Sequence, residues 1–132
     1  MKSGTTAIET LVPPMVEGLD KTQKSFLDYQ LRAFGQRSSS FFALELAGEC
    51  GELANLEKKL WRDANAAVDP KHIADEAADV FIALMNYCNS RGIDLEPTVK
   101  DKLRRIEERR QRGAMGPVPT VIVNPDGSQG AD

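Results

Sequence analysis

Residues 44–63, LELAGECGELANLEKKLWRD, carry the pattern that decides the fold of this chain. Apolar side chains recur there and just before it at the spacing of one helical face, and this stripe consists of Phe42, Leu46, Leu53, Leu56 and Leu60. Three serines at 38–40 are N-cap candidates, so we expect a helix from about Phe41 to Arg62. Three acidic side chains fall beside or within the apolar stripe: Glu45, Glu49 and Glu52.

Residues 74–95, ADEAADVFIALMNYCNSRGIDL, predict a second long helix. Asp69 and Pro70 resemble an N-cap followed by a first-turn proline, and Gly92 is a suitable end, so the helix should span about 70–90. Its apolar stripe consists of Ile73, Ala77, Val80, Leu84 and Cys88. Ile82 and Met85 lie on the opposite side, so the helix is apolar nearly all round. Since a small domain buries such a helix best against another subunit, we expect an oligomer.

Two further helices complete an all-α prediction. The first should begin near Asp20 or Thr22 and end at Gly35, and the last should run from about Asp94 to Arg112. With short connections, four such helices favour a bundle-like domain. We therefore expect a flexible N-terminal arm, an all-α domain and a flexible Pro/Gly-rich tail, over residues 1–20, 21–112 and 113–132. The TVIV run at 120–123 in the tail allows either an edge strand or a mobile segment.

The composition of the chain limits the classes of function that it can have. At 132 residues the chain suits one domain, and its net charge of −3 gives no general attraction to nucleic acid or anionic membrane. No secretory signal is evident, and Cys50 and Cys88 fit buried reduced thiols better than a zinc site, since the sequence has one histidine. We expect a cytoplasmic protein with no membrane partner and no stable nucleic-acid partner.

Four carboxylates on the two central helices have no lysine or arginine within one helical turn: Glu49, Glu52, Glu76 and Asp79. The one conceivable cationic neighbour is His72, four residues before Glu76. Ions beside an apolar stripe cost several kcal/mol each to desolvate unless they are paired. Either basic residues from another helix or a divalent cation must neutralise them, and an all-oxygen set suits Mg²⁺ or Mn²⁺.

Two glycines interleave with the first pair of these glutamates. Gly48 and Gly51 each cost about 1 kcal/mol relative to alanine inside a helix. Close approach of another helix or of a ligand would offset that cost.

These residues together resemble the MazG-like branch of the all-α nucleotide pyrophosphohydrolases. The resemblance rests on Glu-x-x-Glu at 49–52, Asn-x-x-Lys-Lys at 55–59 and Glu-x-x-Asp at 76–79, and it covers roughly residues 26–109. It implies magnesium-dependent hydrolysis of (deoxy)nucleoside triphosphates to monophosphate and pyrophosphate, often for nucleotide-pool house-cleaning, by dimers or tetramers. The metal ligands that it implies are Glu49, Glu52, Glu76 and Asp79.

The resemblance also suggests substrate-binding residues. We expect Glu49 to take the proton from the attacking water, Lys59 to contact phosphate and Asn55 to contact sugar or base. Lys102 is a further phosphate candidate, but the residues after it, Leu103 and Arg104, depart from the Lys-Phe-Asn of many relatives. Base recognition cannot be carried over, and three aromatic residues that could stack on a base are more typical of core positions: Phe34, Trp61 and Tyr87.

Three other interpretations fit this pattern less well. A ferritin-like di-iron bundle needs two Glu-x-x-His motifs, which the single His72 cannot supply. A non-catalytic helical module could use KDKLRRIEERRQR, residues 100–112, to bind RNA or an acidic partner, although its mixed charge is typical of a solvated face. A degenerate relative could bind nucleotide without turnover, but the intact acidic quartet argues against it.

Overall fold

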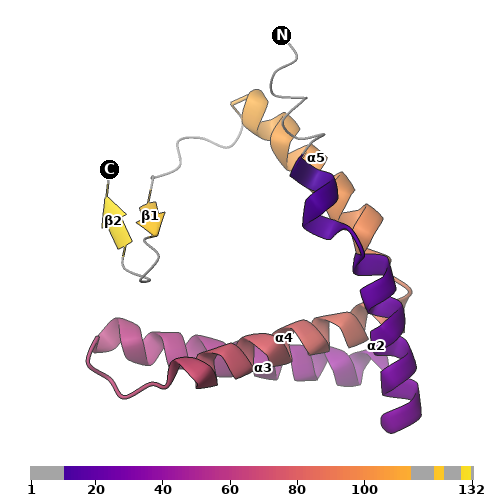
Figure 1. Ribbon diagram of the computed structural model, residues 1–132, viewed down its shortest axis with the longest axis horizontal. Coiled ribbons are helices and arrows are strands. Elements are labelled where there is room, and N and C mark those ends of the chain that lie inside the picture. Colours follow the sequence, from indigo (N-terminus) through magenta and orange to yellow (C-terminus); the bar gives the residue numbers. More distant parts are fainter. Residues whose placement is uncertain (1–10, 114–120, 124–128, 132) are drawn as a thin grey trace.

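The computed structural model describes residues 11–113, 121–123 and 129–131. Four long helices account for most of this part of the chain (Figure 1), and the all-α fold class is confirmed. Their bounds are Leu19–Ala33 for α2, Ser39–Arg62 for α3, Pro70–Arg91 for α4 and Leu95–Gln111 for α5. Within these ranges we find no helix with the length and apolar character needed to cross a membrane.

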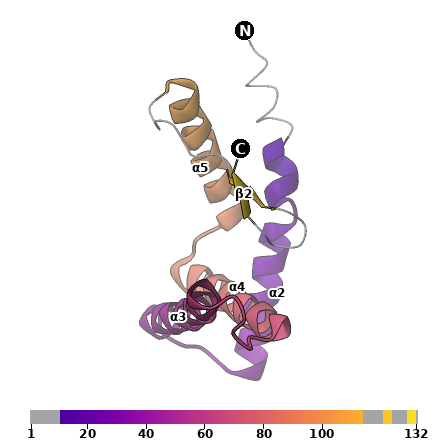
Figure 2. The same cartoon turned by 90° about the vertical axis from the view of Figure 1, so that its left-hand side faces the viewer.

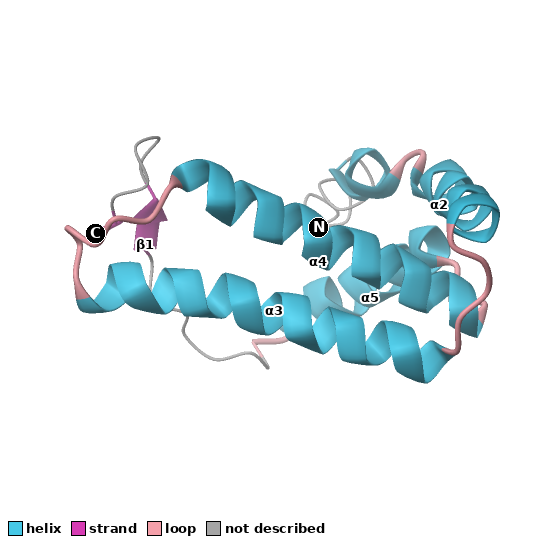
Figure 3. Cartoon of the chain, turned by 90° about the horizontal axis from the view of Figure 1, so that it is seen from below, coloured by secondary structure: helices cyan, strands magenta, loops and turns pink. Residues whose placement is uncertain are grey.

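Helices α3 and α4 form an antiparallel pair that is the centre of the fold (Figures 1 and 3). The predicted start signals operate as expected: the Ser38 hydroxyl accepts a hydrogen bond from the Phe41 amide at 3.1 Å, and Asp69 accepts one from the Lys71 amide at 2.9 Å. Gly92 ends α4 with a φ of 65°, in the left-handed region that glycine adopts without strain. The observed bounds lie within two residues of those expected for both helices.

The buried side chains of α4 do not follow the single stripe that the sequence predicted. Met85, assigned to the far side, is 1% exposed, and Ala83 and Cys88 are also buried, whereas Ala77 is exposed. The reason is that α4 contacts α3 along one face and α2 along another. The thiol expectation holds for Cys88 but is wrong for Cys50, which is exposed.

Helix α2 is fastened to the end of α4 and the start of α5 by one buried amide. Gln23, 4% exposed, donates to the Ile93 carbonyl at 2.7 Å and accepts from the Leu95 amide at 2.8 Å. Asn89 donates in turn to the Gln23 carbonyl at 2.9 Å. Asp94, the residue before α5, makes no side-chain cap, so Gln23 satisfies the first amide of α5 from a different helix.

The second half of the expected N-terminal arm is helical rather than flexible. Residues 11–16 form a helical turn, with Val12 and Val16 buried on one face. Pro13 and Pro14 predict an arm, but both residues are helical in the structure. The first half of the arm, residues 1–10, lies outside the described residues.

Helix α5 packs against α2 and extends away from the α3–α4 pair (Figures 1 and 2). The four helices therefore form an open, bundle-like arrangement within one chain. Large apolar side chains remain on the surface of α2, α3 and the residue after α2, among them Tyr29, Phe34, Leu44 and Trp61, which are 60–83% exposed. The expectation of core positions is therefore wrong for Phe34 and Trp61.

The tail contains a short hairpin. Strand β1, Val121–Val123, pairs antiparallel with β2, Gln129–Ala131, with Ile122 opposite Gly130. Of the two readings of the TVIV run, the strand is the one observed, and its partner comes from the same tail. The flexibility of the tail stays a prediction, and residues 114–120, 124–128 and 132 lie outside the described residues.

Candidate metal centre

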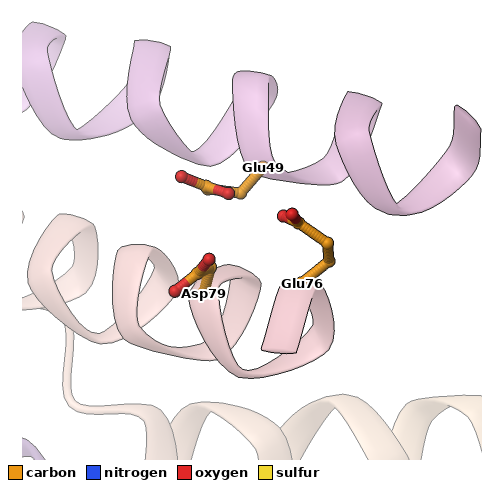
Figure 4. A group of neighbouring side chains, drawn as sticks. All are labelled: Glu49, Glu76 and Asp79. Carbon is orange, nitrogen blue, oxygen red and sulfur yellow. The ribbon is translucent and has the colours of Figure 1, made fainter. Parts of the chain in front are cut away.

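Three of the four predicted carboxylates converge between α3 and α4. Glu49 projects from α3 toward Glu76 and Asp79, which lie one turn apart on α4 (Figure 4). One carboxylate oxygen from each lies within 4.8 Å of the others. The i, i+3 spacing puts both α4 residues on the same face, opposite Glu49.

Burial makes this acidic group costly when it is charged. Glu76 is 9% exposed, and the Oε2 atoms of Glu49 and Glu76 are both buried without a hydrogen-bond partner among the described residues. Glu76 Oε1 lies 3.2 Å from Nε2 of His72, the neighbour that the sequence had identified. That imidazole is largely exposed and reaches one oxygen of one carboxylate, so it leaves the other oxygens uncompensated.

The crowding of the carboxyl groups raises the pKa values of both glutamates. Burial, followed by the charges of Glu52 and Asp79 and the neighbouring Glu76, raises the pKa of Glu49 to about 7. The pKa of Glu76 is also raised, first by its interaction with the Glu52 carboxyl and then by burial, while Glu49 and His72 act in the opposite direction. Protonation is how an acidic cluster relieves repulsion when nothing positive is bound.

The site fits a divalent cation better than an inter-helix salt network. Within the described residues, no lysine or arginine forms an ion pair with Glu49, Glu76 or Asp79. The buried Oε2 atoms of the two glutamates are hard oxygen donors facing one space (Figure 4), which is the ligand type that Mg²⁺ and Mn²⁺ prefer.

The other predicted site residues are not among the three whose oxygens lie within 4.8 Å of one another. Glu52 is exposed, but its carboxyl group interacts with that of Glu76, and it raises the pKa of both Glu49 and Glu76. Asn55 and Lys59 are exposed on α3, and Lys102 is exposed on α5, the helix that extends away from the α3–α4 pair.

The structure removes one of the two expected reasons for the glycines at 48 and 51. A Cβ added at Gly48 or Gly51 would meet nothing within 4 Å, and both residues are exposed. Close helix packing within the described chain therefore does not explain them. Approach of a ligand or of a second chain remains the available reason.

Comparison with known proteins agrees with this geometry. The MazG nucleotide pyrophosphohydrolase domain matches residues 37–113, which include both carboxylate motifs. The chain belongs to the MazG family. A relative, the Gene 37 protein of Mycobacterium phage L5, is 28% identical over 79 residues, covering 58% of this chain and 69% of the phage protein. No solved structure matches the chain significantly. Membership of the MazG family indicates a nucleotide pyrophosphohydrolase, a hydrolase of phosphoanhydride bonds.

Sequence reasoning missed one polar group near this MazG centre. Asn86 lies seven residues after Asp79 on α4 and is 7% exposed. An asparagine on the same helical face as a predicted metal ligand, inside an otherwise apolar run, was the signal that could have identified it.

Proposed function

We propose that this MazG-family chain hydrolyses ribo- or deoxyribonucleoside triphosphates to monophosphate and pyrophosphate in a magnesium-dependent reaction. Manganese would be an acceptable substitute, and the role would be cytoplasmic nucleotide-pool house-cleaning. The observation that carries the proposal is the convergence of Glu49, Glu76 and Asp79 with two buried, unpartnered oxygens.

Glu49, Glu76 and Asp79 would hold the metal, with Glu52 as the fourth ligand. Glu52 already acts on the pKa of Glu49 and Glu76, and its exposed side chain is free to turn toward them. Bound there, a divalent cation would neutralise phosphate oxygens and lower the pKa of water.

Glu49 is our choice for the general base. This choice requires that one oxygen of its carboxylate stays off the metal, where it can accept a proton. The carboxyl group of Glu49 lies opposite Glu76 and Asp79 (Figure 4), so it would be close to a phosphoryl group bound at these carboxylates. It would take the proton from the attacking water as the new phosphorus–oxygen bond forms and the pyrophosphate departs.

Lys59 and Asn55 would contact phosphate and sugar. Lys59 lies seven residues after Glu52 on α3, so the two share a face of the helix. Lys102 on α5 is the third candidate. Since α5 extends away from the α3–α4 pair, Lys102 would most readily serve the site of a neighbouring subunit.

A homodimer or homotetramer is part of the proposal. Leu44 is 75% exposed and Trp61 is 83% exposed on the helix that carries Glu49. Apolar surface of this extent, on several neighbouring helices, marks an interaction site in soluble proteins.

The alternative of a non-catalytic RNA-binding module gains no support from α5. Arg105 is paired with Asp101 at 3.0 Å, and Arg110 with Glu107 at 2.8 Å. These i, i+4 and i, i+3 pairs are typical of a solvated helix face.

The test is turnover of a nucleotide panel. Purified protein is incubated with Mg²⁺ and ribo- and deoxyribonucleoside triphosphates, and monophosphate plus pyrophosphate are resolved from diphosphate plus phosphate. We expect the first product pair, with activity lost in Glu49→Gln and Asp79→Asn.

Matched controls are available one turn or less away. Glu45→Gln and Asp75→Asn make the same chemical changes on the same helices at exposed positions. Both should keep their activity. If no nucleotide is hydrolysed with Mg²⁺ or Mn²⁺, the enzyme proposal is wrong. If the control variants lose as much activity as Glu49→Gln and Asp79→Asn, the assignment of these two carboxylates to the site is wrong.

A further inference from the structure

A second polar site lies between α2 and the end of the α3–α4 pair. It is a pocket of about 250 Å³ with an apolar wall and an amide floor. Leu27 and Leu31 of α2 and Phe42 of α3 form the wall. The amide side chains of the lining are Gln30, Gln36, Asn86 and Asn89. A flat ring with polar atoms on its edge is the kind of ligand that such a lining accommodates.

The pocket is in line with the carboxylates. Asn86 follows Asp79 by seven residues on α4, and Phe42 precedes Glu49 by seven on the antiparallel α3. Seven residues are close to two full helical turns, so both lie on the carboxylate-bearing faces about 10 Å along the helix axes. The pocket lining does not include the carboxylates, so the proposal requires one extended molecule whose charged end reaches the carboxylates and whose ring lies in the pocket.

The amides of Gln30 and Asn86 are oriented by a backbone carbonyl. Gln30 Nε2 donates to the Gly35 carbonyl at 3.1 Å, and a carbonyl can only accept. The Gln30 oxygen therefore faces Asn86, whose Nδ2 donates to it at 3.5 Å. This leaves the Asn86 oxygen and one of its two N–H hydrogens without a partner among the described residues.

Asn86 therefore has an acceptor and a donor that no described side chain uses. The residue is 7% exposed and lines the pocket, so a ligand bound there can hydrogen-bond these groups. Asn89, one turn further along, differs because its donor reaches the Gln23 carbonyl at 2.9 Å and its oxygen accepts from Gln23 Nε2 at 3.4 Å.

We infer that this pocket binds the base of the nucleotide and that Asn86 is the residue that reads the edge of that base. The inference rests on the proposed function and deepens it. An asparagine amide pairs with a base edge that presents an N–H next to an acceptor, through two hydrogen bonds. Gln30 is a positioning residue that holds Asn86 in the reading orientation, and the leucines and Phe42 cover the ring.

The first test needs no turnover. Uniformly ¹⁵N-labelled protein in EDTA is titrated with adenosine, guanosine, cytidine and uridine 5′-monophosphates, and the side-chain amide resonances are followed. The Asn86 signal is assigned by its disappearance in Asn86→Leu, and that of Gln30 by Gln30→Leu. We expect both to shift with at least one nucleotide, and shifts confined to other residues would overturn the inference.

The second test measures selectivity. In the hydrolysis assay, Asn86→Leu should reduce the ratio of kcat/KM between the preferred and the least preferred base by roughly ten- to a hundredfold. Gln30→Leu should reduce the same ratio although Gln30 does not contact the base, because Asn86 then loses the partner that holds its orientation. Asn65→Leu is the control, since it makes the same chemical change at an exposed position that is not part of the pocket lining, and the ranking of bases should survive it.

The outcomes separate the two proposals. Hydrolysis with unchanged base ranking in Asn86→Leu overturns the base-reading role and leaves the proposed function intact. If no hydrolysis is seen but nucleotides shift the Asn86 resonance, the proposed activity is wrong and the assignment of the pocket as a base-binding site stands. Thermal unfolding of each variant verifies that it is folded at the assay temperature.

Discussion

Glu49 on α3 and Glu76 on α4 each hold one buried carboxylate oxygen that no described residue hydrogen-bonds. Their carboxyl groups face each other across the helix pair, with Asp79 beside them (Figure 4). The repulsion between these carboxylates therefore lies within the contact between α3 and α4, the most extensive helix contact among the described residues. The metal-free protein should therefore be sensitive to pH and to divalent cations in ways that an ordinary helical hairpin is not.

Raising the pH should destabilise the metal-free protein between about pH 4.5 and pH 7. The pKa of Glu49 is about 7 in the folded chain against 4.5 for an unperturbed glutamate, so in this window the folded state holds more protons than the unfolded state. By linkage, the free energy of unfolding then falls as pH rises. The raised pKa of Glu76 acts in the same direction. Urea unfolding in EDTA at pH 5 and pH 7.5 measures the difference.

Glu49→Gln is the variant that checks this assignment. It removes the titrating group and the repulsion together, so its stability should change less over the same pH range. A slope equal to that of the wild type would mean that other groups carry the pH dependence.

Mg²⁺ or Mn²⁺ should raise the midpoint of thermal unfolding at pH 7.5. A cation that binds the folded state alone stabilises it by about 2.7 kcal/mol at a hundredfold excess over its Kd. The effect should weaken toward pH 5.5, because protons then compete for Glu49. Glu76→Gln should lose most of the response, whereas Glu45→Gln, exposed one turn away from Glu49, should retain it. A full response in Glu76→Gln would place the cation elsewhere.

The sequence predicted the acidic site because its evidence is local. Whether Glu49 or Asp79 has a basic neighbour within one turn can be counted along the chain, and so can the motif spacing. Which side chains of α4 are buried could not be predicted by counting along the chain. Met85 is buried because α2 crosses α4, and Gln23 caps α5 because the α4–α5 loop returns to α2. Both depend on contacts between distant parts of the chain, which a helical period does not encode.

Gly48→Ala and Gly51→Ala should stabilise the isolated chain by up to about 1 kcal/mol each. Both glycines lie inside α3, and an added methyl group would meet nothing within 4 Å. Gly92→Ala is the opposite control, because its φ of 65° strains any residue with a Cβ. Denaturant unfolding at low protein concentration gives all three values. If the first two variants are more stable yet assemble or turn over less well, their face contacts another chain or the substrate.

Leu44→Lys should disrupt assembly without unfolding the chain. Leu44 is 75% exposed, so in an isolated subunit the change should alter the free energy of unfolding by less than about 0.5 kcal/mol. At a subunit contact it would bury a charge, and light scattering coupled to size exclusion should show a smaller particle. Glu57→Lys, exposed on another side of α3, introduces the same residue and should leave the mass unchanged. A monomeric wild type would contradict the homo-oligomer proposal.

Gln23→Leu should cost about 1–3 kcal/mol of stability, since it leaves the Ile93 carbonyl and the Leu95 amide buried or half-buried without their partner. Asp94→Ala is the informative control, because Asp94 occupies the N-cap position of α5 but makes no cap hydrogen bond. In most helices the N-cap substitution would be the more harmful of the two. Here we expect the reverse order in urea unfolding at fixed pH. A larger loss in Asp94→Ala would show that α5 is held by its own cap and not by Gln23 of α2.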